Sequence, residues 1–170
     1  MTNRVETRYW LIGVGMLVAL IGFEMIFMGD SAFSIVDHQA AGTAARVNEI
    51  QSTWHDEGYF GLQTLGMIGD LVFIVIYSIG TMRAGRGLRA GASVITRTIG
   101  LLVLALGGVF FATDITETSL QLVQMLMNEG SDGMAGIAAF MQPIKVLAWI
   151  GSFVAVLVGL LANRLSSRAA

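Results

Sequence analysis

The sequence predicts an all-α membrane protein: a four-transmembrane-helix bundle with both termini in the cytoplasm and amphipathic helical segments on the outer side. Hydrophobic residues make up 55% of the chain and charged residues only 13%, whereas soluble domains carry about 25% charged residues. The apolar residues also gather in four blocks. Three of them approach or exceed the ~20 residues that cross the hydrocarbon layer of a bilayer, and the third along the chain reaches that length if it is extended at either end. We therefore interpret the 170 residues as a single membrane domain.

The first apolar block is predicted to be a transmembrane helix at about residues 9–28. A cleaved signal peptide is the alternative, because the block lies near the N-terminus. The apolar region of a signal peptide is usually about 7–15 residues long, whereas this block is longer, contains Glu24 and lacks an A-x-A cleavage site. We expect it to stay in the protein as an anchor.

An outer segment, residues 30–57, follows the first block. His38 and His55 lie in it near carboxylates, and this combination can hold zinc. However, the two histidines lack the i, i+4 spacing of a helical metal motif, so we expect a solvated polar face, no metal site and no cofactor. The apolar residues of the segment recur at helical spacing, which predicts an amphipathic helix lying on the membrane or capping the bundle. They are Val36, Ala40, Val47, Ile50 and Trp54.

Three more apolar blocks follow the outer segment. Gly130 is predicted to end a helix, and Pro143 suits the first turn of the last transmembrane helix. A basic loop in this part matches no phosphate-binding spacing, so we expect it to set the topology and to touch anionic lipid headgroups. The predicted elements are a second transmembrane helix at 59–82, the basic loop at 83–97, a third helix at 98–113 or somewhat longer, an outer helical segment at 114–142 and a fourth helix at 144–163.

Positive charges predict the orientation of the chain, because Lys and Arg accumulate on the cytoplasmic side of membrane proteins. Both termini and the basic loop are therefore predicted to be cytoplasmic, in a multi-pass protein of the inner (cytoplasmic) membrane. The residues behind this prediction are Arg4 and Arg8 before the first block, Arg83, Arg86, Arg89 and Arg97 between the second and third, and Arg164 and Arg168 after the fourth.

Each predicted transmembrane helix carries polar residues and glycines on one face, because they recur about every seven residues. Small residues let helices approach closely and polar groups avoid lipid, so these faces should meet along a polar seam. The aligned residues are Gly13 and Glu24 in the first helix; Gln63, Asp70 and Tyr77 in the second; Gly100, Gly107, Asp114 and Gln121 in the third; and Lys145, Ser152 and Gly159 in the fourth.

Acidic residues outnumber basic ones inside the predicted bundle. Glu24, Asp70 and Asp114 compete for one intramembrane cation, Lys145. Inserting an ionised Asp at the centre of a transmembrane helix costs about 2.5–3.5 kcal/mol. An acidic residue that does not pair with Lys145 therefore needs a proton or an external cation. The structural alternative is a protonated Asp70 that ties helices together through a hydrogen bond.

The predicted site binds a proton, a cation or a small polar, amine-bearing ligand. It opens to the extracytoplasmic side, because the ionisable residues lie in the outer half and the middle of the membrane. Asp114 and Glu117 have a second interpretation, because the sequence D-I-T-E is also typical of a capping box at the start of a helix. The members are Asp70 at the core, Glu24 as its neighbour, Lys145 as the internal counter-ion, Asp114 and Glu117 at the mouth, and Gln63 and Tyr77 as hydrogen-bonding neighbours.

We expect a non-enzymatic integral membrane protein whose partners include membrane lipids. The chain has no cysteine, which excludes disulfides and thiolate metal sites. It also lacks the basic, aromatic-interleaved face that binds nucleic acid. Two other functions stay open. One is an accessory or scaffold subunit that binds other membrane-protein subunits or a second copy of this chain; the other is a lipid-modifying enzyme with carboxylates near Trp149.

Several short motifs resemble a known group. Their order is similar to that in small four-helix integral membrane proteins of bacteria, and the resemblance covers nearly the whole chain. It implies a bacterial inner membrane and a shared polar seam, and it implies no reaction. In that group an Asn commonly follows the Glu of the third helix, where this chain has Thr118. The motifs are DEGYF in the outer segment, Asp70, Phe73 and Tyr77 as D-x-x-F-x-x-x-Y, ATDITE with Asp114 and Glu117, and Pro143 with Lys145.

Overall fold

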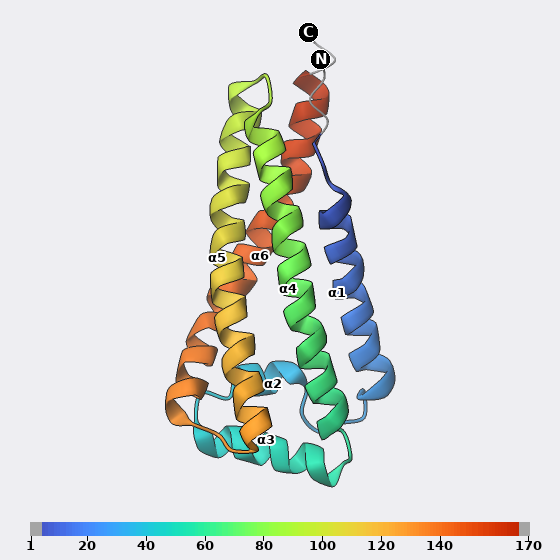
Figure 1. Ribbon diagram of the computed structural model, residues 1–170, viewed down its shortest axis with the longest axis vertical. Helices are drawn as coiled ribbons and strands as arrows, with labels where there is room; N and C mark the ends of the chain where they lie inside the picture. The colour runs from blue at the N-terminus through green and yellow to red at the C-terminus, as the bar shows by residue number, and fades with distance from the viewer. Residues whose placement is uncertain (1–4, 167–170) are drawn as a thin grey trace. The chain divides into compact units, whose positions relative to one another are not determined.

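The computed structural model describes residues 5–166, and all regular structure in that range is α-helical (Figure 1). Four helices are long and apolar enough to cross a membrane, which indicates a multi-pass membrane protein. Arg4 and Arg168, used above to predict the orientation, lie outside the described residues. The helices are α1 (Arg8–Phe27), α2 (Ile35–Gln39), α3 (Ala44–Asp56), α4 (Phe60–Arg89), α5 (Val94–Met127) and α6 (Asp132–Ser166), of which α1, α4, α5 and α6 are the four long ones.

The structure divides into two compact units. Unit 1 contains the chain up to Gly15, Val75–Ala112, and the chain from Lys145 onward; unit 2 contains Met16–Ile74 and Thr113–Ile144. Every long helix contributes residues to both units, whereas α2 and α3 belong to unit 2 alone. Charge follows the same division. Of the eight Lys and Arg that the structure describes, seven fall in unit 1, and of the twelve Asp and Glu eleven fall in unit 2.

The long helices extend past their predicted ends. Only residues 90–93 separate α4 from α5, so most of the predicted basic loop is helical. α5 also continues to Met127, which places Asp114 and Glu117 in the middle of a helix. The capping-box interpretation of these two residues is therefore wrong. Inside a membrane the backbone must satisfy its own hydrogen bonds, and continuing the helix through polar residues does so.

α6 also begins earlier than predicted. It starts at Asp132, and Pro143 lies inside the helix, not in its first turn. Proline has no backbone N–H, so the carbonyl four residues earlier, that of Ala139, loses its helical donor. An Asp in the first turn favours this earlier start, because the free N–H groups there attract negative charge.

The outer segment forms two helices where one was predicted. α2 and α3 are separated by residues 40–43, in which Gly42 has φ +71°. Glycine adopts this left-handed conformation without steric cost, so the chain turns there. Of the residues predicted to share one apolar face, those in α3 are buried, whereas Val36 and Ala40 are exposed.

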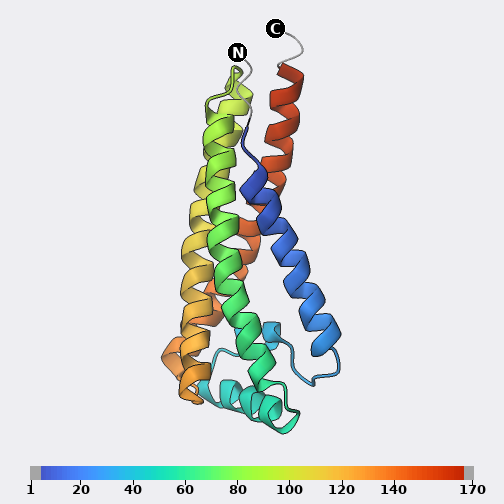
Figure 2. The same ribbon diagram turned by 45° about the vertical axis from the view of Figure 1, so that its right-hand side comes forward.

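α3 lies at the end of unit 2 where α4 begins and α5 ends, and it runs across these helices in both views (Figures 1 and 2). The indole Nε1 of Trp54 donates to the carbonyl of Phe33 at 2.8 Å, which ties the segment before α2 to α3. An apolar cluster fixes α3 to the long helices. Its buried members are Ile50, Trp54, Met67 and Met125, and Phe33, Ile35, Ala41, Phe60 and Leu122 pack against them.

In unit 1, glycines allow the helices to approach closely. A Cβ added at Gly13 would lie 2.7 Å from the Cα of Tyr77, and one added at Gly107 would lie 2.8 Å from Cγ2 of Thr81. Both distances are shorter than van der Waals contact, so α4 packs directly on these backbones. The prediction that Gly13 and Gly107 lie on faces where helices meet is confirmed.

We expect Gly80→Ala to lower the thermal unfolding midpoint of the detergent-purified protein by about 4 °C or more. The added Cβ would overlap the backbone nitrogen of Trp10 and separate α1 from α4 within unit 1. Gly15→Ala is the control, because nothing lies within 4 Å of a Cβ at that position of α1. Alanine favours a helix over glycine by about 1 kcal/mol, so the control should keep or raise the midpoint. Equal midpoints for the two variants would contradict the close contact.

Candidate functional site

In unit 2, two carboxylates from different helices converge on one hydroxyl group. Oγ1 of Thr118 lies 3.2 Å from Oδ2 of Asp70 in α4 and 3.4 Å from Oδ1 of Asp114 in its own helix, α5. A threonine hydroxyl has one hydrogen, so it donates to only one of these carboxylates at a time. Asp114 and Thr118 are buried and Asp70 is half-buried. We call Asp70 and Asp114 the acidic pair.

The buried side of α5 is polar along three turns. At 3.6 residues per turn, five polar residues fall within about a third of the helix circumference. Each is exposed by 3% or less. Polar groups in a membrane-spanning helix need polar partners, so this face points to the protein interior and not to lipid. The residues, named here the α5 polar face, are Asp114, Glu117, Thr118, Gln121 and Gln124.

Two buried glutamines in the long helices of unit 2 have amide atoms without a hydrogen-bond partner among the described residues. They are Gln121 in α5, whose Oε1 and Nε2 are both unpaired, and Gln63 in α4, whose Nε2 is unpaired. The two side chains are 1% and 2% exposed. A buried amide left unpaired costs about 1–3 kcal/mol, and bound water usually satisfies such groups in proteins. The interior of unit 2 therefore has hydrogen-bond donors and acceptors available for water or another small polar molecule.

Glu24 makes a contact with the outer segment. Its Oε1 accepts the backbone N–H of Ile35, the first residue of α2, at 3.1 Å. The first N–H groups of a helix have no partner within the helix, so a carboxylate there is stabilising. This bond ties α2 to the end of α1. The place of Glu24 beside Asp70 stays a prediction.

Two predicted site residues, Tyr77 and Lys145, belong to unit 1. The hydroxyl of Tyr77 lies 3.4 Å from Oγ of Ser152, and its ring packs edge to face on Phe110 with ring centroids 5.2 Å apart. Lys145 is buried, with 9% of its surface exposed. Their predicted roles toward the acids of unit 2 stay predictions.

A buried histidine lies in the outer segment, where the sequence predicted a solvated face. His38 is 2% exposed, its Nε2 lies 3.2 Å from Nε2 of Gln51, and its ring packs against Trp54. Burial lowers the pKa of His38 from 6.5 to about 4, because the charged imidazolium is poorly solvated there. The prediction is wrong for His38 because the break after α2 turns His38 inward and Val36 outward; His55 is exposed.

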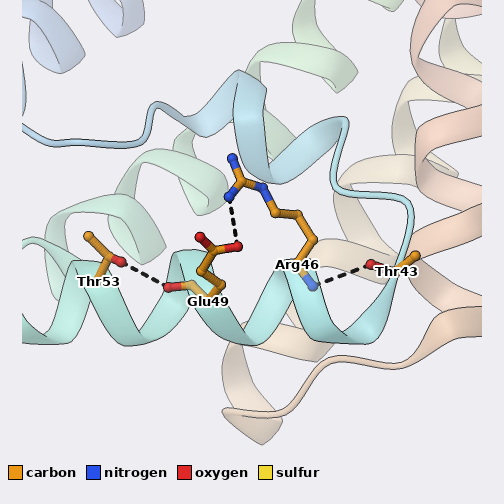
Figure 3. Close-up of polar contacts among 4 residues, drawn as sticks. All are labelled: Thr43, Arg46, Glu49 and Thr53. Atoms are coloured by element: carbon orange, nitrogen blue, oxygen red, sulfur yellow. Dashed lines mark hydrogen bonds and ion pairs between the residues drawn. The ribbon is translucent and has the colours of Figure 1, made fainter.

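Four polar residues along α3 and at its start make local contacts (Figure 3). Oγ1 of Thr43 accepts the N–H of Arg46 at 3.3 Å, and Oγ1 of Thr53 donates to the carbonyl of Glu49 at 2.9 Å. Arg46 pairs with Glu49 at 2.7 Å and covers the ring of Phe33. Exposed ion pairs contribute about 1 kcal/mol or less, so these contacts order α3 and do not form a site.

A cavity of about 250 Å³ lies between α3 and the residues that follow α5. Nε2 of His55 lies 2.9 Å from Oδ1 of Asn128, and the histidine ring stacks on Phe60, so this wall is well supported. Among residues 5–166, no three His, Asp or Glu side chains are grouped in a way that could hold a metal ion. The lining is Asn48, Gln51, Ser52, His55, Asn128 and Glu129, whose amides, hydroxyl and carboxylate suit water or a small polar solute.

Sequence reasoning named the acids of the site but missed Thr118 as the group that joins them. The signal was present, because Thr118 follows Asp114 by four residues and therefore lies on the same helix face. Comparisons with known protein families, curated proteins and solved structures found no match to this chain. The resemblance to small four-helix membrane proteins of bacteria stays a prediction.

We expect Thr118→Val to destabilise the protein by about 1.5–3 kcal/mol, the typical contribution of a hydrogen bond to a charged group. Valine keeps the shape of threonine but leaves Asp70 and Asp114 without their common donor. Chemical unfolding in detergent measures the change. Thr118→Ser keeps the hydroxyl and should recover most of the loss. If serine and valine destabilise equally, the hydroxyl does not hold the acidic pair.

We expect the free energy of unfolding to fall as the pH drops from 6.5 to about 4, by up to about 3 kcal/mol from His38. In this window the unfolded histidine binds a proton that the folded, buried one does not, so protonation favours the unfolded chain. His38→Gln should flatten this part of the pH profile, whereas His55→Gln, at the exposed histidine, should leave it unchanged. Unfolding curves at closely spaced pH values test this; identical slopes for wild type and His38→Gln would contradict it.

Proposed function

We propose that this chain is an integral membrane protein that binds one positive charge at the acidic pair. The charge is a proton, a small monovalent cation or the protonated amine of a small polar ligand. The observation that carries the proposal is the convergence of Asp70 and Asp114 on the Thr118 hydroxyl, at 3.2 and 3.4 Å.

Electrostatics supports this proposal. Two carboxylates that share one hydroxyl repel each other when both are ionised, because a protein interior screens charge poorly. A single positive charge relieves that repulsion, and the Thr118 oxygen can serve as a further ligand. Arg46 is the one Lys or Arg in unit 2, all of whose residues the structure describes, against eleven Asp and Glu. Such an excess of negative charge raises the local concentration of cations.

The proposed orientation places both termini in the cytoplasm of a bacterial inner membrane, with the site opening to the extracytoplasmic side. The basic residues of unit 1 around residues 83–97 support it through the positive-inside rule. Arg83 is ordered there, since it pairs with Glu6 at 3.0 Å and covers the ring of Tyr9. In this orientation α3 lies on the outer surface of the membrane as an amphipathic helix.

A thermal-shift titration tests the function. We expect sodium chloride or methylammonium chloride, against N-methyl-D-glucamine chloride at equal ionic strength and pH, to raise the unfolding midpoint of the detergent-purified protein. Binding at 100 times the dissociation constant stabilises by about 2.7 kcal/mol. Asp70→Asn and Asp114→Asn should abolish the cation-dependent shift, because each removes a charge of the acidic pair. Glu49→Gln, at an exposed carboxylate paired with Arg46, should retain it.

A cation-dependent shift that survives in both Asp variants would place the binding site elsewhere. The proposal would be contradicted if neither sodium nor methylammonium stabilised the wild type and if Asp70→Asn and Asp114→Asn left the pH profile of unfolding unchanged. The acids would then serve only to hold helices together, as in an accessory or scaffold subunit.

A further inference from the structure

The α5 polar face leads from the acidic pair toward the end of the helix. Thr118, Gln121 and Gln124 follow one another at three-residue intervals, a rise of about 4.5 Å each. One water molecule that makes two hydrogen bonds of about 2.8 Å can bridge such a gap. Gln124 continues the path to the last turn, where its Oε1 accepts the N–H of Ser131 at 2.9 Å.

Other buried polar atoms of unit 2 also lack a partner in the described part of the chain. Besides Gln63 and Gln121, the atoms without a hydrogen-bond partner among the described residues include Oε1 of Gln51 and Nδ1 of His38. All four side chains are at least 98% buried. Leaving all of them dry would cost several kcal/mol at about 1–3 kcal/mol for each group. Bound waters, each making about three hydrogen bonds, would remove that cost.

The cavity beside α3 supplies the entrance. Gln51 lines this cavity and also contacts His38, so it joins the surface to the buried polar groups. At the other edge, Oδ1 of Asn48 accepts the N–H of Gly130 at 2.6 Å, which fixes the turn after α5 against α3. The cavity is thus built from ordered polar residues at the end of the α5 polar face.

We propose that a chain of bound water molecules runs through unit 2 from this cavity to the acidic pair. It is the route by which a proton or a small monovalent cation reaches Asp70 and Asp114. The inference rests on the proposed function for its destination, and on the unpaired buried amides and the cavity for its course. The cavity beside α3 is polar and carries few charges, so a hydrated cation can enter it without binding tightly there.

Cysteine accessibility tests the route, since the chain has no cysteine and a single introduced thiol reports without background. Silver ion is the probe, because it is a small monovalent cation that displaces the thiol proton to form a silver thiolate. We expect Gln121→Cys to react with Ag⁺ at least tenfold faster than Met125→Cys. The extent of reaction is measured as the thiol left for N-ethylmaleimide after quenching and denaturation, by intact mass.

Met125→Cys is a matched control. Met125 lies in the same helix, four residues nearer the cavity end, and is 1% exposed, but it belongs to the apolar cluster of Ile50, Trp54 and Met67. If distance from the cavity alone set the reaction rate, the thiol at position 125 would react first, because it lies nearer the cavity. If a water-filled polar route sets the rate, the thiol at position 121 reacts first. Gln63→Cys provides a second polar position on α4 if Gln121→Cys does not fold, as judged by gel filtration and a cooperative thermal transition.

The outcomes separate this inference from the proposed function. Slow reaction of both Gln121→Cys and Gln63→Cys, at the rate of Met125→Cys, overturns the route even if sodium or methylammonium still stabilises the protein. Fast reaction of the polar positions without any cation-dependent stabilisation supports the route and counts against the cation site. Sealed vesicles of the two orientations, treated with Ag⁺ briefly, show which side the route opens to, and faster reaction from the extracytoplasmic side is expected.

Discussion

The structure depends on one constraint: within a membrane, every polar group that is not in water must find its partner inside the protein. The backbone meets this constraint by staying helical, which explains why α5 runs unbroken from Val94 to Met127 through its acidic residues. The side chains meet it by facing inward. Five polar residues on one side of α5 are almost completely buried, and Thr118 links that side to Asp70 of α4.

Hydrogen bonds that join helices and a binding site are not exclusive alternatives here. The hydroxyl of Thr118 ties α4 to α5, because it lies within hydrogen-bonding distance of a carboxylate on each helix. The unpaired amides of Gln63 and Gln121 show that the same interior is polar beyond what its own hydrogen bonds consume. A protein built only for helix association would be more stable with apolar residues at such positions. These unpaired polar groups are the physical argument that the interior binds water, a proton or a cation.

The outer segment is fixed to unit 2, which also carries most of the acidic residues. Glu24, Trp54 and the apolar cluster fix α2 and α3 to unit 2, so the cavity beside α3 has ordered walls. Nearly all acidic residues lie in this unit and nearly all basic ones in the other. The same uneven distribution that supports a cytoplasmic location for the basic residues also surrounds the candidate site with negative charge.

The sequence by itself determined the number of long apolar helices and the glycine faces of Gly13 and Gly107, because hydropathy and helical period are local properties. It also named the acids of the candidate site. It misjudged where α5 ends, since polar residues stay helical when the interior satisfies them, and it misjudged where α6 begins. The tertiary structure alone decided that Thr118 joins Asp70 to Asp114 and that His38 is buried. Both depend on how distant segments pack, and a turn at Gly42 changes which face is inside without changing the apolar pattern.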